Sequence, residues 1–267
     1  FEGGIDLGFD DVPEVGGPEA CALVLGHPGH ELRIFQTVAR IKPVAYLLTD
    51  GSGGTGRPRT ESTLRALASA GVSLAAPFPP PLPDAVLYAA LLSGDHRALL
   101  DWARALADDL RRRRIRTVIA DAAEGFNPAH DVCRAIARAA RQAAGADRGY
   151  AYLLEGRPDV CPRGREQGAV TVAGTADELS RKQAAIDAYV EIQCEVQRFT
   201  AVWGREAFAR EWLFRDDAPV DDPPDDVPPA YERFGEARVT AGKYCDVIRY
   251  EAHVRPFLEA LRAEFRG

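Results

Sequence analysis

The stretch that decides the fold is Ala20-Cys21-Ala22-Leu23-Val24-Leu25, followed directly by Gly26-His27-Pro28-Gly29-His30-Glu31. Its first half is a short, unbroken apolar run, which is typical of a central parallel strand covered on both faces. Pro28 prevents the strand from continuing, and the apolar spacing of residues 30–40 predicts a helix. The stretch therefore predicts a strand, a turn that carries two histidines, and a helix.

The same alternation of strands and helices continues along the chain. Strands are expected at about 20–26, 43–49, 72–76 and 116–120, with further strands near 149–154 and 169–172. Helices are expected at about 30–40, 60–70, 95–112 and 129–143, with a long helix from about 176 to 198. This βαβ rhythm predicts an α/β fold, with a Rossmann-like, doubly wound, mostly parallel sheet flanked by helices.

The length of 267 residues suits one large α/β domain that spans residues 1–267. Its expected parts are an N-terminal arm at 1–18, a core at about 19–200, a C-terminal extension at about 201–267, and an Asp- and Pro-rich loop at 216–229 within that extension. The proline-dense segment from Pro77 to Pro83 can be neither helix nor central strand, so it is expected as a loop over the ligand edge of the sheet.

Composition restricts the classes of partner. A net charge of -7 argues against nucleic acid as the main partner, because phosphate binding needs clustered Lys and Arg. Five widely spaced cysteines without a Cys-x-x-Cys pair indicate reduced thiols and a cytoplasmic protein. Apolar runs are too short to span a bilayer, so no membrane partner is expected. A small-molecule substrate is expected, and the chain is a possible homo-oligomer.

The two histidines of the opening stretch indicate a metal site. His27 and His30 lie where a strand ends, which is the edge of an open α/β sheet where ligands bind. A third ligand should come from another strand end, because catalytic zinc usually has three protein ligands. His130 is the best candidate, since it follows the apolar strand at 116–120 in a second turn that contains a proline. The alternative is a pair of hydrogen-bonded histidines in an ordinary turn.

These residues resemble the LmbE-like (PIG-L) zinc-dependent N-deacetylases. That family has a His-Pro-Asp-Asp-Glu turn after its first strand and a distal His-Pro-Asp-His turn. The likeness covers about residues 19–200 in the right order. Its further segments here are Leu47 to Gly54, Arg57 to Glu61, Leu64 to Val72, Asp84, and Lys182 to Gln193.

The resemblance implies a Zn²⁺ ion held by His27 and His130, with His30 at the position of the family's third ligand, a carboxylate. A His₃ site is therefore expected, with Fe²⁺ or another divalent transition metal as the alternative. Gly29 stands where the family has its catalytic Asp, and the distal turn has Asn127 and Ala129 where the family has His and Asp. The metal scaffold is retained, but the usual proton acceptor is absent.

Several carboxylates are candidates for a replacement general base. Asp50, after the second strand, is the first choice, although it could instead cap its own turn. Asp84 and Glu31 are further catalytic candidates, and Glu31 could also orient a ligand histidine or cap the helix. Asp121 and Glu124 lie beside the distal turn. The candidates for substrate binding are Arg57, Arg59 and Asn127.

Three functions are compatible with these features. The first is a zinc-dependent hydrolase that cleaves an amide, such as an N-acyl group on an amino sugar or a related small biosynthetic metabolite. The second is a non-hydrolytic metalloenzyme on the same scaffold, because three imidazoles also suit a redox metal. The third is a binding protein with a relict metal site.

Overall fold

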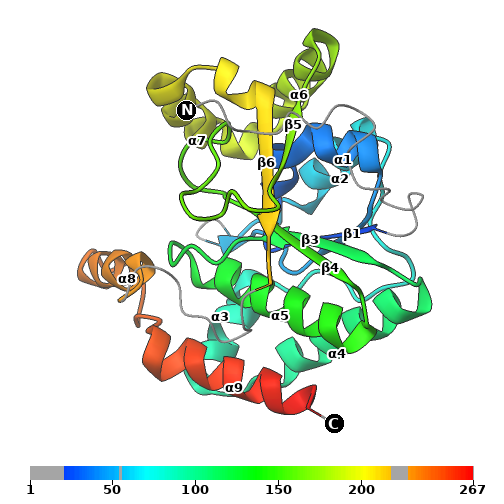
Figure 1. Ribbon diagram of the computed structural model, residues 1–267. Coiled ribbons are helices and arrows are strands. Elements are labelled where there is room, and N and C mark those ends of the chain that lie inside the picture. The colour runs from blue at the N-terminus through cyan, green and yellow to red at the C-terminus, as the bar shows by residue number, and fades with distance from the viewer. Residues whose placement is uncertain (1–20, 54–55, 218–227, 267) are drawn as a thin grey trace.

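The structure is a computed structural model that describes residues 21–53, 56–217 and 228–266. Its described residues form a six-stranded sheet with the strand order β2-β1-β3-β4-β6-β5, and helices pack on both faces (Figure 1). The predicted α/β fold with a mostly parallel, doubly wound sheet is confirmed. The N-terminal arm at 1–18 and most of the Asp- and Pro-rich loop lie outside the described residues.

The parallel half of the sheet matches four predicted strands. They are β1 (Cys21–Leu25), β2 (Val44–Leu47), β3 (Thr117–Asp121) and β4 (Arg148–Tyr152). β1 lies between β2 and β3, and every residue of β1 is buried. The chain builds outward from β1 to β2 on one side and from β3 to β4 on the other. The ends of β1 and β3 therefore flank the switch point of the sheet, where α/β proteins bind ligands.

The other edge of the sheet is antiparallel. β6 (Arg210–Arg215) pairs antiparallel with β4, and the predicted strand β5 (Val170–Ala173) pairs antiparallel with β6. The sequence analysis did not predict β6. This strand inserts between β4 and β5, so its hydrogen bonds join two segments that are distant along the chain.

Two layers of helices cover the sheet. The helices are α1 (Phe35–Ile41), α2 (Thr60–Ser69), α3 (Asp84–Ser93), α4 (Arg97–Arg112), α5 (Pro128–Ala144), α6 (Ala176–Ala188), α7 (Gln193–Trp203), α8 (Ala230–Thr240) and α9 (Arg255–Glu264). The short helical turns are η2 (His30–Ile34), η4 (Val190–Ile192), η5 (Glu206–Ala209) and η6 (Tyr250–Val254). Ala22 and Val24 of β1 pack in the layer of α4, α5 and α9, whereas Leu23 and Leu25 pack in the layer of α1, α2 and α6. This alternation is the two-residue period of a strand buried on both faces.

Three predicted elements differ from the structure. The expected strand at 72–76 is reduced to one bridge, between Leu74 and Ala45. The expected helix at 30–40 begins as the 3-10 turn η2 and becomes α-helical only at Phe35. The expected long helix at 176–198 is interrupted at Tyr189, which has ψ of 85° and lies fully buried against the core. Burial of the Tyr189 ring thus ends the helix at that point.

The start of the Asp- and Pro-rich segment is not a surface excursion. Asp216 is buried, and its Oδ1 accepts hydrogen bonds from the guanidinium groups of Arg134 and Arg138 on α5, at 2.9 and 2.7 Å. The proline-dense loop lies where expected, because Leu82 forms a bridge with Thr49 at the end of β2. This bridge brings Asp84, the first residue of α3, to the ligand edge of the sheet.

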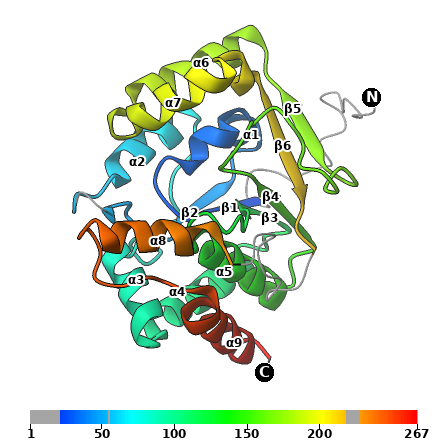
Figure 2. The ribbon, with the colours of Figure 1, turned by 90° about the vertical axis from the view of Figure 1, so that its left-hand side faces the viewer.

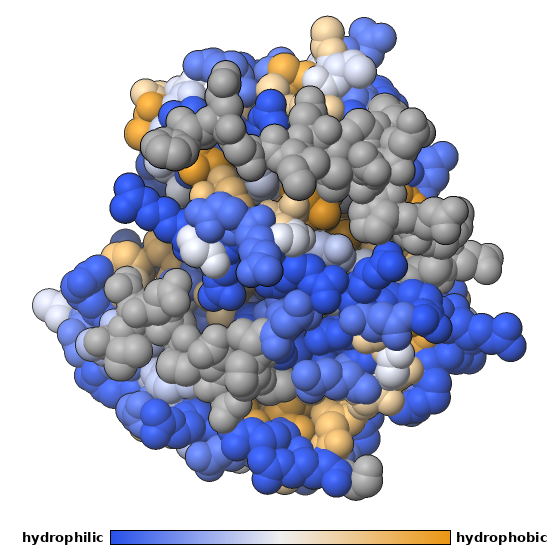
Figure 3. All heavy atoms as spheres, in the orientation of Figure 1, coloured by the Kyte–Doolittle hydropathy of each residue, from blue (hydrophilic) through white to orange (hydrophobic). Residues whose placement is uncertain are grey.

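The outer face seen in Figure 3 is mostly hydrophilic, with apolar residues in small separate areas. No helix among the described residues is long and apolar enough to cross a membrane. All five cysteines are free thiols, and two of them, Cys21 and Cys133, are buried.

Candidate functional site

The three predicted ligand histidines come from the two turns at the switch point. His27 follows β1 by two residues, and His30 begins η2. His130 is the third residue of α5, which begins after the turn that follows β3. Because β1 and β3 are neighbours in the sheet, both turns emerge side by side at the carboxyl ends of these strands.

The three imidazole rings converge. The ring centres are 5.4 Å apart for His27 and His30, 5.5 Å for His27 and His130, and 4.7 Å for His30 and His130. Imidazoles on one tetrahedral zinc, with Zn–N distances of about 2.0–2.1 Å, have ring centres roughly 5 Å apart. Within the described part of the chain, no set of three or more His, Cys, Asp or Glu side chains already has the donor arrangement of a metal site. A metal here therefore requires the rings to turn their nitrogens toward one point.

Hydrogen bonds fix the tautomer of His27. Thr49 Oγ1 lies 2.6 Å from His27 Nδ1 and donates its own proton to the carbonyl oxygen of Gly26, at 2.8 Å. The hydroxyl therefore accepts from Nδ1–H, which leaves the lone pair on Nε2 of His27. Asp84 Oδ1 is 3.4 Å from the same Nδ1. A carboxylate and a hydroxyl behind Nδ1 are the partners that orient metal-binding histidines.

His30 is held by a buried carboxylate. Its Nδ1 lies 2.8 Å from Oδ2 of Asp121, a residue with no exposed surface, and this carboxylate also accepts from the Gly26 N–H and the Tyr152 hydroxyl, each at 2.8 Å. The backbone N–H of His27 lies 3.4 Å from the same Nδ1, and this longer contact is weaker than the contact of Nδ1 with Asp121. A Cβ at Gly26 would lie 2.5 Å from Asp121 Oδ2, so glycine is needed for this close approach. Burial lowers the pKa of His30 against the opposing effect of Asp121, and Nε2 keeps its lone pair.

His130 differs from the other two histidines. Its Nδ1 is buried and has no hydrogen-bond partner. Burial, followed by the nearby His30 and His27, holds the pKa of His130 well below its usual value. A buried, neutral imidazole with an unpartnered nitrogen fits a metal ligand, because the metal binds the neutral ring. The donor set of this cluster therefore suits zinc or another divalent transition metal.

The turn around Gly29 has a backbone that few other residues adopt. Gly29 has a φ of 103°, and its N–H donates to Glu31 Oε2 at 2.9 Å and to Thr63 Oγ1 at 3.0 Å. A Cβ at this position would meet Tyr189 and Ile192 at 3.6 to 3.7 Å. Any side chain at position 29 would therefore have a strained backbone.

The three predicted catalytic carboxylates have distinct partners. Asp50 Oδ1 accepts from Ser52 N and Oγ, at 2.9 and 2.6 Å, so Asp50 caps its own turn. Burial alone would raise the pKa of Asp84, but the nearby His27 and the Gly53 N–H, which donates to Oδ2 at 2.7 Å, lower it to about 2. Burial raises the pKa of Glu31 to about 7, and its Oε1 is buried without a partner.

The two carboxylates beside the distal turn have different partners. Asp121 holds His30, as described above. Glu124 accepts from the backbone N–H groups of Leu154 and Glu155, at 2.8 and 3.1 Å, and so links the distal turn to the end of β4. Burial raises the pKa of Glu124 to about 7. Glu124 therefore has a stabilising contact in the loop.

Of the three predicted substrate-binding residues, Asn127 lies nearest the histidines. It is the N-cap of α5, where its Oδ1 accepts from Ala129 N at 2.9 Å, and its Nδ2 is 3.5 Å from His27 Nε2. Arg59 donates from Nε to the carbonyl oxygen of Gly51, at 3.0 Å, in the turn after β2. Arg57 is exposed two residues earlier, in the loop before α2.

The other two histidines lie in different surroundings. His96 precedes α4 and packs against Phe257 of α9, with ring centres 5.5 Å apart. His253 lies in η6, where its Nδ1 accepts from the Arg249 N–H at 2.8 Å. Neither contact involves the three converging rings, so both histidines lie outside the cluster.

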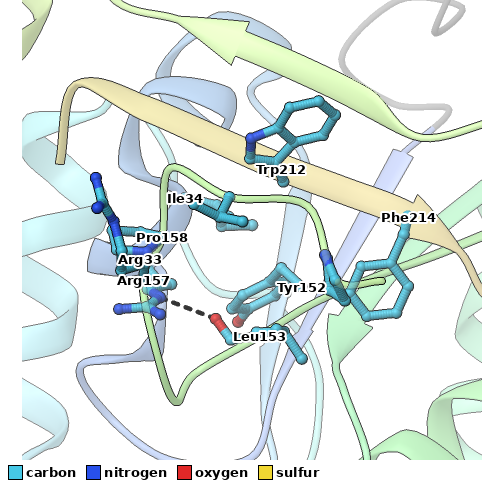
Figure 4. A pocket seen from close by; sticks show the side chains of 10 residues that line it. Arg33, Ile34, Tyr152, Leu153, Arg157, Pro158, Trp212 and Phe214 are labelled. Atoms are coloured by element: carbon cyan, nitrogen blue, oxygen red, sulfur yellow. Dashed lines mark hydrogen bonds between the residues drawn. The ribbon is translucent and has the colours of Figure 1, made fainter. Parts of the chain in front are cut away.

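A separate hollow lies between the loop after β4 and strand β6 (Figure 4). It contains about 270 Å³ of empty space, part of which is open to solvent, and Tyr152, Trp212 and Phe214 form its aromatic wall. Arg33 closes one side by donating to the Leu153 carbonyl at 2.9 Å. None of the predicted site residues lines this hollow, so it is distinct from the histidine cluster.

Comparison with known proteins gives structural relatives. No family model and no curated protein sequence matches the chain. The A40926 pseudoaglycone deacetylase Dbv21 superimposes with a TM-score of 0.54 and 12% sequence identity, over 74% of this chain and 97% of that protein. A triple mutant of a deacetylase from the teicoplanin biosynthetic pathway superimposes with a TM-score of 0.51 and 13% identity, over 75% of this chain and 100% of that protein. The chain therefore shares the fold of these two deacetylases.

Proposed function

We propose that the chain is a metal-dependent hydrolase that cleaves an amide bond, most simply an N-deacetylase. The observation that carries this proposal is the convergence of His27, His30 and His130 at the switch point of the sheet. The shared fold with known deacetylases supports the same reaction class, although fold alone does not assign chemistry.

In this proposal the three imidazoles hold Zn²⁺, with Fe²⁺ or another divalent transition metal as the alternative. Such an ion supplies Lewis acidity to an amide carbonyl and lowers the pKa of a water molecule. Asp121 and the Thr49–Asp84 pair keep Nδ1 of His30 and His27 protonated, so that each Nε2 can act as a ligand. A histidine in place of a carboxylate ligand removes one negative charge from the metal. Asp121, which is hydrogen-bonded to Nδ1 of His30, supplies a negative charge behind that ring.

The proton acceptor is proposed from the carboxylates that border this cluster. Asp50 Oδ1 accepts hydrogen bonds from Ser52. Glu31 Oε1 and Asp84 Oδ1 are both buried without a hydrogen-bond partner, but Asp84 Oδ1 faces Nδ1 of His27 at 3.4 Å. We therefore place Glu31 first among the three and assign Asp84 to orienting His27. A general base must reach the attacking water, so conservative variants of all three carboxylates distinguish them.

The proposed substrate is a small molecule with an N-acyl group, such as an N-acyl amino sugar. Asn127 has its amide 3.5 Å from His27 Nε2, which would allow it to donate to an oxygen of the substrate bound beside that imidazole. Arg59 and Arg57, at the same edge of the sheet, would bind hydroxyl or anionic groups farther from the amide.

The test combines metal content with release of acid. The wild-type chain, reconstituted with Zn²⁺, should bind about one ion and release acetate from N-acetyl amino sugars, and His27→Ala should do neither. His253→Gln is the matched control, because His253 lies in η6 with partners outside the cluster. The control should retain both properties. A wild-type chain without bound metal, or a His27→Ala variant with unchanged acetate release, would disprove the proposal.

A further inference from the structure

An exposed aromatic surface lies next to the histidine cluster. It consists of Phe126 in the distal turn, Phe234 on α8 and Tyr244 after α8, which are 39%, 43% and 47% exposed. The rings of Phe126 and Phe234 are in edge contact, with centres 5.3 Å apart. Large aromatic side chains grouped at a surface in this way mark a binding region rather than ordinary surface composition.

The backbone of the distal turn connects this surface to the cluster. Phe126 directly precedes Asn127, whose amide contacts His27, and Tyr88 donates to Asn127 Oδ1 at 3.3 Å. Tyr244 lies close enough to Tyr88 to act on its raised pKa, after burial and Asp84, so the two side chains are near each other. The aromatic surface is therefore continuous with the proposed reaction site.

Helix α8 is fixed in place at this position. Tyr231 is its only buried residue, and the Tyr231 N–H donates to the carbonyl oxygen of Gly125 in the distal turn, at 3.0 Å. On the other side, Glu232 accepts from the backbone of Tyr250 at 2.8 Å and pairs with Arg249 at 3.2 Å. Figure 2 shows α8 below the ends of β1 and β2 and next to α5. The helix thus presents its aromatic residues from a rigid position.

We propose that this surface binds an aromatic ring carried by the substrate next to the scissile amide. The occupant is part of the same small molecule, because the surface continues into the proposed reaction site. Two guanidinium groups lie over the rings, Arg233 at 5.7 Å from the centre of Phe234 and Arg238 at 5.6 Å from the centre of Tyr244. They give the surface positive charge, which suits the π face of an aromatic group over a plain alkyl chain.

This inference rests on the proposed function and deepens it by naming a substrate class. The probes are the methyl and phenyl glycosides of N-acetylglucosamine, which share the scissile amide and differ only in the ring. The wild-type chain should favour the phenyl glycoside over the methyl glycoside by about tenfold in kcat/KM. This factor corresponds to the binding free energy that one aromatic ring pair contributes. Phe234→Ala should reduce this ratio to near one, and Val202→Ala, an exposed change on α7, should leave it unchanged.

Binding of both glycosides is measured in parallel by ligand-observed NMR, which needs no turnover. Preferential binding of the phenyl glycoside, lost in Phe234→Ala, would support the surface even if neither compound is hydrolysed, and that result would count against the proposed substrate alone. Equal binding of both glycosides to the wild-type chain, or an unchanged preference in folded Phe234→Ala, would overturn the inference.

Discussion

In the turn after β1, His27 and His30 each have Nδ1 in a hydrogen bond, to Thr49 and Asp121, whereas Nδ1 of His130 in the distal turn has no partner. Both turns follow neighbouring strands and contain a proline, but only in the first turn do hydrogen bonds fix the orientation of the histidine rings. The imidazoles of the first turn are thus held in place by the protein, whereas the distal turn contains a buried ring nitrogen without a hydrogen-bond partner.

The largest expected effect concerns the residue that joins the two turns. Asp121 ends β3 and binds His30 of the first turn. Asp121→Asn should weaken Zn²⁺ binding about 10- to 100-fold, because the amide cannot supply the negative charge behind Nδ1. Titration with a competing chelator measures this affinity. Tyr152→Phe, which removes only one hydrogen bond to the carboxylate, is the control and should show a smaller loss. Equal affinities for wild type and Asp121→Asn would remove Asp121 from this role.

The second prediction restores the family residue in the first turn. Gly29→Asp should lower the free energy of unfolding by about 1 to 3 kcal/mol, because φ is 103° at this position. It should not raise the rate of hydrolysis, since its Cβ would point toward Tyr189 and Ile192. Denaturant unfolding and initial rates check both parts, with Gly29→Ala as the control for backbone strain. A Gly29→Asp enzyme that is faster than wild type would refute the description of this turn.

The third prediction tests the distal turn through pH. Burial raises the pKa of Glu124 to about 7, above its value in the unfolded chain, so its contribution to stability is full below about pH 4.5 and is lost as the pH rises to 7. The loss should be about 3 kcal/mol. Chemical unfolding between pH 4.5 and 7.5 should show a flatter profile for Glu124→Gln than for wild type. Identical profiles would mean that Glu124 titrates normally.

The smallest expected effect is at the helix cap of the distal turn. Asn127→Ala removes the acceptor for Ala129 N–H and should lower the free energy of unfolding by about 1 kcal/mol. Asn127→Ser keeps a capping oxygen and should recover most of that loss. Thermal unfolding of the three proteins measures the difference. If the serine variant is as unstable as the alanine variant, the cap does not explain the stability of this turn.

The sequence was most informative where local pattern and structure agree. The apolar run at 20–26 and the shorter one within 116–120 predicted β1 and β3, because a strand buried on both faces leaves such a run. The positions of the two turns after these strands could therefore also be predicted. The convergence of His27, His30 and His130 could be predicted from these turns. The βαβ rhythm implied that both turns lie at the same edge of the sheet. The strand order places them next to each other.

The parts that sequence reasoning missed depend on contacts between distant segments. β6 pairs with β4 and β5 across more than 30 residues, and its sequence, Arg-Glu-Trp-Leu-Phe-Arg, has no strict alternation. The break at Tyr189 comes from burial of its ring. α8 has a single buried residue and no clear apolar face, so its position beside the distal turn could not be predicted.

Within the site, the residues that orient the three histidines were harder to predict than the histidines themselves. Asp121 was considered as a replacement base, but the structure places its carboxylate on His30. Thr49 and Tyr152 were not singled out, since a threonine at a strand end and a tyrosine within a strand are ordinary. The only available signal was their position at the carboxyl ends of β2 and β4, next to the switch point. Asp50 caps its turn, which was the alternative interpretation of that residue.

The most direct test of the account is calorimetric titration of the chain with Zn²⁺, for wild type and for His130→Ala. We expect one tightly bound ion per wild-type chain and loss of that binding in a folded His130→Ala variant, because the proposed third ligand comes from the distal turn. A wild-type chain that binds no zinc, or a His130→Ala variant that binds it with unchanged affinity, would contradict the proposed three-histidine site.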